Sequence, residues 1–162
     1  MTAFETVLHG RFSNLSYPRR YTKTDKALAM RAMEKTDTAG YAEKMMWELS
    51  GGMRQRVYIA MALCQDTGYI LMDEPLTYLD AAGQLELMRI LKSLAREGRG
   101  IIAVMHDLPL AFTFADKITV LHNGHIAYSG VPSAKEASDA VNRVLGVTLI
   151  RNDDGSYRYK YI

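Results

Sequence analysis

Residues 49–56 read Leu-Ser-Gly-Gly-Met-Arg-Gln-Arg, a pattern typical of a helix that begins with a serine and two glycines. Ser50 can cap the helix that follows it, and two glycines at the helix start let backbone N–H groups approach an anion closely. A helix N-terminus also carries partial positive charge, so the pattern predicts a phosphate-binding site. A plain serine-capped helix start is the better explanation of a bare Ser-Gly-Gly, so the rest of the chain must decide.

Acidic and imidazole side chains follow two expected strands. Residues 69–72 (YILM) form a short apolar run that ends in Asp73 and Glu74, and residues 101–105 form a second run that ends at His106. Parallel strands are buried as continuous apolar runs, and their carboxyl ends present side chains to a crevice. Taken alone, an acidic strand end is better explained as a solvated turn, and a lone histidine is usually structural.

A helix with one apolar face is expected over residues 81–96, directly after Asp80, which is a good N-cap residue. Its apolar positions recur at three- and four-residue spacing: Leu85, Met88, Leu91 and Leu94. A helix between two strands is the crossover that parallel strands need. The alternation of strand and helix over residues 69–122 therefore predicts an α/β fold with a parallel sheet.

Further helices and strands are expected on both sides of this segment. Helices are predicted over residues 24–36 (beginning at Thr24 or Asp25), 108–115 and 134–145. The helix after Ser50 is expected to be buried over residues 57–63, because nearly every position there is apolar. Strands at 118–121 and 125–128 flank Asn123-Gly124, a strong hairpin signal, and two more are expected within 147–162 around Asp154-Gly155.

The composition is that of an ordinary soluble protein, with 48% hydrophobic and 23% charged residues. The net charge of +2 is too small to argue for a nucleic acid partner. No apolar stretch approaches the roughly 18 residues that span a bilayer, and the first residues lack a secretory leader pattern, so a cytosolic protein is expected. The single cysteine, Cys64, is expected to pack in the core, and Arg19, Arg20 and Lys23 are expected to lie on a solvated surface.

Four motifs in order resemble the ATPase subunit of ABC transporters. LSGG with Gln55 resembles the signature, YILMDE at 69–74 the Walker B strand, LTYLD at 76–80 the D-loop, and His106 the switch histidine. The run DEPLTYLDAAGQLELMRIL, followed by MHDLPLAFTFADKI, is most similar to the ATPases of ferric-siderophore, haem and cobalamin importers. The resemblance implies a P-loop NTPase-like core with a parallel sheet and flanking helices, joined to part of the helical signature subdomain.

The resemblance also implies a role for each site residue. The signature residues would contact, from across a dimer, the ATP that a second subunit holds: Leu49, Ser50, Gly51, Gly52 and Gln55. Asp73 would hold Mg²⁺ through water, and Glu74 would act as general base on the attacking water. His106 would contact the γ-phosphate, and Asp80 would communicate across the head-to-tail dimer.

One motif of the family is missing, because no G-x-x-x-x-G-K-[ST] phosphate loop occurs in the 162 residues. In the family this loop and the Q-loop glutamine lie upstream of a segment like residues 7–20 (VLHGRFSNLSYPRR). We therefore expect an N-terminally truncated cassette without the β-subdomain and the Walker A strand. Without the loop lysine and its N–H cradle, phosphate charge is not neutralised within the chain, so little ATP hydrolysis is expected from this chain alone.

The expected organisation is a single partial ABC ATPase domain. It would comprise a helical and signature subdomain (1–64), a catalytic core (65–130) and a C-terminal helix and hairpin (131–162). The implied partners are a second ATPase subunit and transmembrane permease subunits at the cytoplasmic face of the cell membrane, with no nucleic acid and no direct membrane insertion. The implied function is ATP hydrolysis that energises import of an iron-siderophore, haem or cobalamin. The alternative is a non-catalytic half-site or regulatory module that supplies Ser50 and Gly52 in trans to an intact ATPase.

Overall fold

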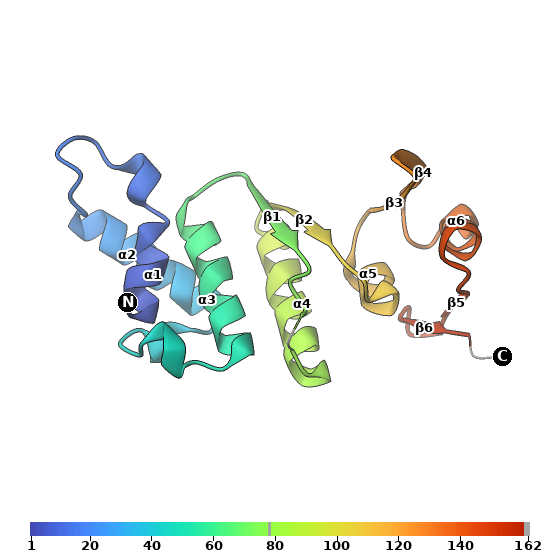
Figure 1. The fold of residues 1–162 in the computed structure, drawn as a ribbon, viewed down its shortest axis with the longest axis horizontal. Helices are drawn as coiled ribbons and strands as arrows, with labels where there is room; N and C mark the ends of the chain where they lie inside the picture. The colour runs from blue at the N-terminus through green and yellow to red at the C-terminus, as the bar shows by residue number, and fades with distance from the viewer. Residues whose placement is uncertain (78, 161–162) are drawn as a thin grey trace. The chain divides into compact units, whose positions relative to one another are not determined.

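The computed structural model describes residues 1–77 and 79–160, which fold as two compact units, Met1–Val104 and Met105–Ile162 (Figure 1). The first unit contains α1 (Ala3–His9), α2 (Lys23–Lys35), α3 (Gly51–Cys64), β1 (Tyr69–Asp73), α4 (Ala81–Arg96) and β2 (Gly100–Val104). It also contains three short 3-10 helices: η1 (Phe12–Asn14), η2 (Ala39–Tyr41) and η3 (Met46–Glu48). The second unit contains α5 (Leu108–Phe114), β3 (Ile118–His122), β4 (His125–Gly130), α6 (Lys135–Leu145), β5 (Leu149–Arg151) and β6 (Tyr157–Tyr159). Among the described residues, none of the helices has the length and apolar character of a membrane span.

The first three helices pack around one another. Helix α1, which the sequence pattern did not predict, begins at a capping box in which the Thr2 side chain and Glu5 satisfy each other's backbone N–H groups. Gly10 follows α1 at its contact with α3, where an added Cβ would lie 2.3 Å from the carbonyl oxygen of Met61. The close approach of the two helices therefore depends on glycine. Cys64 at the end of α3 is buried, as expected.

Helix α2 begins at Lys23, one residue before the predicted start at Thr24. Thr22 is the N-cap: its hydroxyl accepts a hydrogen bond from the N–H of Asp25, and the Asp25 carboxylate accepts one from the N–H of Thr22. Asp25 is thus the partner in a capping box and not the cap itself. The prediction of Thr24 or Asp25 as the first cap was wrong, because both partners of the box are good cap residues and only the backbone distinguishes them.

A parallel strand pair with a crossover helix forms the rest of the first unit, as predicted. Tyr69 lies opposite Gly100, and the register continues to Asp73 opposite Val104. Helix α4 connects the strands and buries its own apolar face: Leu87, Met88, Leu91 and Leu94. Ile70 of β1 is buried as well.

The prediction that these strands are buried on both faces was wrong. Leu71 is 74% exposed, and Tyr69, Ile102 and Val104 are also more than half exposed. Side chains of a strand alternate between the two faces of a sheet, so one layer of helix covers only every second residue. Within the described residues of the first unit no helix layer buries the other face, and these four side chains are exposed.

Two helix faces differ from their predicted burial. Tyr58 in α3 is exposed although its neighbours Val57 and Ile59 are buried, because an apolar helix still turns one side outward when helices pack on the other. In α4 the spacing predicted Leu85 on the apolar face, but Leu85 is exposed and Leu87 is buried instead. The spacing of leucines alone could not distinguish these two positions.

The second unit contains two antiparallel hairpins and two helices. Strands β3 and β4 flank Asn123 and Gly124, whose positive φ angles of 48° and 77° match the predicted tight turn. Strands β3 and β4 form a sheet of their own, so the parallel sheet expected to extend to residue 122 consists of β1 and β2. Strands β5 and β6 form the second hairpin, as predicted. The buried core of this unit comprises Phe112, Ile118, Ala137, Val141, Leu149 and Tyr157.

Candidate functional site

The glycine-opened helix start that the sequence predicted is the first turn of α3. Ser50 is exposed, and its Oγ accepts a hydrogen bond from the backbone N–H of Met53 at 3.3 Å. Leu49 before it is buried and anchors the turn. The N–H groups of Gly51 and Gly52 lie in the first turn, where an α-helix offers them no internal partner. The arrangement suits an anion, because donors, helix dipole and an exposed hydroxyl meet at one end of the helix.

The segment before α4 packs against this turn. An added Cβ on Gly52 would lie 2.8 Å from Cδ2 of Leu79, so the absence of a side chain at Gly52 makes room for that leucine. Asp80 is the N-cap of α4 and accepts a hydrogen bond from the N–H of Gly83 at 2.8 Å, which confirms its capping role. Leu79 lies in the predicted D-loop, but its contact with Gly52 was not predicted, since no spacing rule relates it to a glycine so far away along the chain.

The acidic pair lies at the carboxyl end of β1. Asp73 and Glu74 are both exposed, and Glu74 has a left-handed backbone with φ of 45°. The N–H of Glu74 donates to the carbonyl oxygen of Val104 at 3.0 Å, at the end of the neighbouring strand. The hydroxyl of Thr77 donates to Oε2 of Glu74 at 3.3 Å. The two strand ends and a following threonine therefore fix the direction of this carboxylate.

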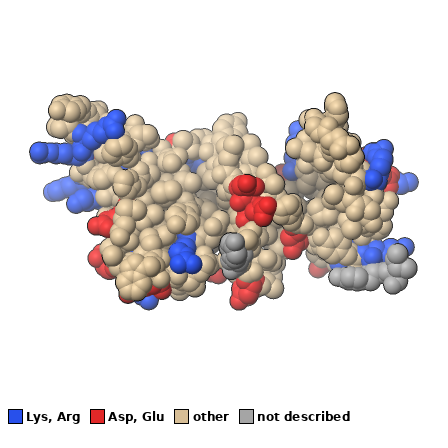
Figure 2. All heavy atoms as spheres, in the orientation of Figure 1, with Lys and Arg blue, Asp and Glu red and all other residues tan. Residues whose placement is uncertain are grey.

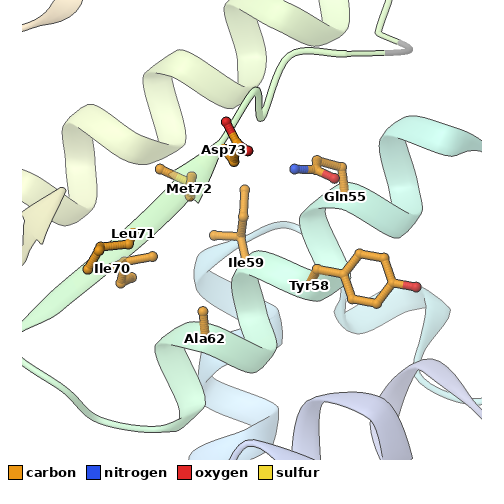
Figure 3. A pocket seen from close by; sticks show the side chains of 8 residues that line it. All are labelled: Gln55, Tyr58, Ile59, Ala62, Ile70, Leu71, Met72 and Asp73. Atoms are coloured by element: carbon orange, nitrogen blue, oxygen red, sulfur yellow. The ribbon is translucent and has the colours of Figure 1, made fainter. Parts of the chain in front are cut away.

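The signature helix and the Walker B-like strand share a cavity of about 190 Å³ (Figure 3). The polar side chains of Gln55 and Asp73 lie at one end of it, and they come from α3 and β1. The rest of the lining comes from Tyr58, Ile59, Ala62, Ile70, Leu71 and Met72. Two residues that the sequence predicted as separate parts of the site are therefore brought together within the first unit.

Arg56, the last residue of the signature stretch, forms ion pairs with other side chains of the first unit. Its Nη1 lies 3.0 Å from Oε1 of Glu86 and 3.5 Å from Oδ2 of Asp37, and its side chain is mostly buried. Both contacts are ion pairs, and neither has the geometry of a hydrogen bond. Arg56 therefore links α3 to α4 and to the turn after α2, close to the residues of the predicted site.

The donor set can be compared with what a phosphate and Mg²⁺ require. Residues 1–77 and 79–160 contain no cluster of three His, Cys, Asp or Glu side chains that could hold a metal. Mg²⁺ commonly keeps several waters and takes one or two carboxylates together with phosphate oxygens. The single exposed carboxylate of Asp73 fits that limited role. The open first turn at Ser50 fits a phosphate oxygen.

His106 belongs to the second unit and is exposed. The next residue, Asp107, is the N-cap of α5 and accepts a hydrogen bond from the N–H of Leu110 at 2.9 Å. The imidazole is therefore carried on a short segment between the end of β2 and a capped helix.

The family model described as ABC transporter matches residues 1–77. The petrobactin import ATP-binding protein FpuC of Bacillus anthracis is 37% identical over 150 residues, which are 92% of this chain and 55% of that protein. The iron(3+)-hydroxamate import ATP-binding protein FhuC of Bacillus subtilis (strain 168) is 40% identical over 148 residues, which are 91% of this chain and 55% of that protein. The chain spans about half the length of the curated relatives it matches.

Solved structures have the same fold. The dimeric structure of MJ0796, a bacterial ABC transporter cassette, superposes with a TM-score of 0.68 at 27% identity and covers 83% of this chain and 58% of that chain. The α/β fold of the P-loop NTPase type that the sequence predicted is thereby confirmed. Motifs, relatives and fold agree: residues 1–77 match the ABC transporter family model, and over nine tenths of its length the chain is similar to import ATP-binding proteins.

Proposed function

We propose that this chain carries the signature, Walker B and D-loop functions of an ATP-binding subunit that energises import of an iron-siderophore, haem or cobalamin. The main support is the shared cavity, which the signature glutamine and the acid at the end of β1 both line within one compact unit. Relatives named as import ATP-binding proteins for petrobactin and iron(3+)-hydroxamate support the direction of transport and the type of cargo.

The signature turn binds a phosphate group of the nucleotide. Ser50 donates its hydroxyl proton to a phosphate oxygen, and the N–H groups of Gly51 and Gly52 add two further donors. Leu49 holds the turn in place from the core, and Gln55 extends the polar surface toward β1. The nucleotide that these groups contact is held by a second subunit.

The acidic residues at the end of β1 are the catalytic groups of the proposed site. Asp73 would hold Mg²⁺ through water, and the ion when bound would supply positive charge that stabilises the transferring phosphate. Glu74 accepts a proton from the attacking water, and the hydrogen bond from Thr77 keeps its carboxylate in one direction. A general base of this kind contributes on the order of 10²–10⁴ in rate. His106 contacts the γ-phosphate and positions the water.

The proposed assembly is a head-to-tail dimer of ATPase subunits bound to transmembrane permease subunits at the cytoplasmic face of the membrane. Asp80 communicates between the two nucleotide sites, and the contact of Leu79 with Gly52 supports this, because it joins the D-loop to the signature turn. Residues 1–64 act as the helical and signature subdomain, 65–130 as the catalytic core, and 131–162 as a C-terminal helix and hairpin.

A second candidate function rests on the sequence. No G-x-x-x-x-G-K-[ST] loop occurs in the chain, and such a loop neutralises the β- and γ-phosphates in the family. A chain that offers Ser50 and Gly52 but no phosphate loop can act as a half-site or regulatory module for an intact ATPase subunit.

Steady-state ATP hydrolysis by an intact importer ATPase, with and without this chain, tests both functions. The chain alone is expected to hydrolyse little ATP. Stimulation or dominant inhibition that is lost in Ser50→Ala, but kept in the control Ser93→Ala on the exposed side of α4, supports the half-site. Turnover by the chain alone that Glu74→Gln abolishes would show that it contains a complete site, and no effect in any mixture would contradict the half-site.

A further inference from the structure

The basic loop, residues 12–23 (FSNLSYPRRYTK), runs from η1 to the first residue of α2 and carries cations and aromatic rings and no acidic residue. Arg19, Arg20 and Lys23 are all exposed, and Tyr17 is 96% exposed. Phe12 is exposed as well, and the guanidinium of Arg19 lies 4.6 Å from the centre of its ring. Figure 2 shows Lys and Arg side chains gathered at this end of the first unit.

The loop is held at its base. Nε of Arg11 pairs with Oδ1 of Asp25 at 3.1 Å, and the two side chains are only 13% and 10% exposed. A second nitrogen of Arg11 donates to the carbonyl oxygen of Cys64 at 3.2 Å, which ties the loop base to α3. Thr22 completes the closure through its capping box with Asp25. The cations and rings are thus presented on a closed surface loop, a type of segment that is frequently functional.

The cations of the loop have no carboxylate partner among the described residues. No carboxylate in residues 1–77 or 79–160 lies within ion-pair distance of Arg19, Arg20 or Lys23. Three cations without a neighbouring acid attract an anionic partner, and this attraction reaches about one Debye length into solution.

We propose that the basic loop docks on anionic phospholipid headgroups at a membrane surface. The charges complement such a surface, and phenylalanine and tyrosine rings beside cations are the side chains that anchor at the membrane interface. An acidic protein segment would also neutralise the cations, but only a partner with a shaped recess of its own could bury a ring as exposed as that of Tyr17, whereas the membrane interface accepts such a ring without one. The proposal needs no nucleotide, so it can hold or fail independently of the proposed ATPase function.

Vesicle flotation with the purified full chain tests this docking. Binding is expected to vesicles that contain phosphatidylserine and not to vesicles of phosphatidylcholine alone, and it should weaken as salt is raised. The triple variant Arg19→Gln, Arg20→Gln, Lys23→Gln should bind on the order of 100-fold more weakly, because each surface cation contributes about fivefold. The ring of Tyr17 should also matter, so Tyr17→Ser should reduce binding several-fold.

A matched control removes the same charge elsewhere. Arg89, Arg96 and Arg143 are exposed and lie outside the loop, and changing all three to Gln alters the net charge equally. Unchanged far-UV circular dichroism establishes that each variant is folded. Equal loss of binding in the control and loop variants would overturn the proposal, as would equal binding to neutral vesicles. Binding of immobilised polyglutamate that depends on the loop while vesicle binding does not would assign the loop to an acidic protein and also overturn it.

Discussion

Replacing Gly10 with alanine should separate α1 from α3. Gly10 has an ordinary right-handed helical backbone, with φ of −55° and ψ of −26°, so alanine suits its conformation. Any loss of stability in Gly10→Ala must therefore come from the added methyl group. That group would lie 2.3 Å from the carbonyl oxygen of Met61 and 3.2 Å from Cβ of Cys64.

The size of the effect follows from this contact. The methyl carbon needs about 3.4 Å from the oxygen, so one of the two helices must move by about 1 Å. The oxygen of Met61 belongs to the backbone of α3 and cannot rotate away as a side chain could. Overpacking of this kind costs about 1–3 kcal/mol, and the better helix propensity of alanine returns less than about 1 kcal/mol. We expect Gly10→Ala to lower the free energy of unfolding by about 2 kcal/mol.

Urea unfolding followed by far-UV circular dichroism measures this difference, since the long helices of the first unit dominate the signal. Gly40→Ala is the matched control, because no atom lies within 4 Å of a Cβ added at Gly40. The control should keep its stability or gain up to about 1 kcal/mol. Equal unfolding midpoints for Gly10→Ala and Gly40→Ala would refute the view that the helix contact requires glycine.

Three further predictions concern burial and ionisation. Leu87→Ala should lower the free energy of unfolding by about 2–5 kcal/mol, because Leu87 is 1% exposed, whereas Leu85→Ala at 39% exposed should cost less than about 1 kcal/mol in the same urea titration. Burial raises the pKa of the Cys64 thiol to about 11, so its alkylation at mildly alkaline pH should be on the order of 100-fold slower than that of a free thiol until denaturant is added. Hydrogen bonds from Thr22 hold the pKa of Asp25 below its ordinary value of about 3.9. Asp25→Asn should therefore cost about 1–3 kcal/mol at neutral pH, and acid titration should show this difference shrinking as the pH falls below about 4 and the native carboxyl takes up its proton.

Features set by local chemistry could be predicted from the sequence. Helix α4 begins at Asp80 and covers residues 81–96 as expected, because an N-cap and an amphipathic face are both local signals. The hairpin around Asn123 and Gly124 was predicted for the same reason. The serine-capped, glycine-opened start of α3 is a third example, and its exposure is what a phosphate site needs.

Features that depend on which layers meet could not be predicted. The apolar run at residues 69–72 indicated a buried strand, but Leu71 faces solvent since one helix layer covers one face only. The leucine spacing in α4 did not show that Leu87 and not Leu85 faces the core. The packing of Leu79 against Gly52 likewise depends on tertiary contact and has no signature in the sequence.

The backbone at Glu74 links local strain to the proposed chemistry. A left-handed conformation costs a residue with a Cβ roughly 1–2 kcal/mol, and it persists only where the surroundings impose it. Here the N–H of Glu74 is held by Val104 of the neighbouring strand, and the N–H of Thr77 donates to the carbonyl oxygen of Glu74 at 3.2 Å. A left-handed glutamate directly after Asp73, with a hydroxyl that donates to its carboxylate, supports the proposal that Glu74 is a positioned base.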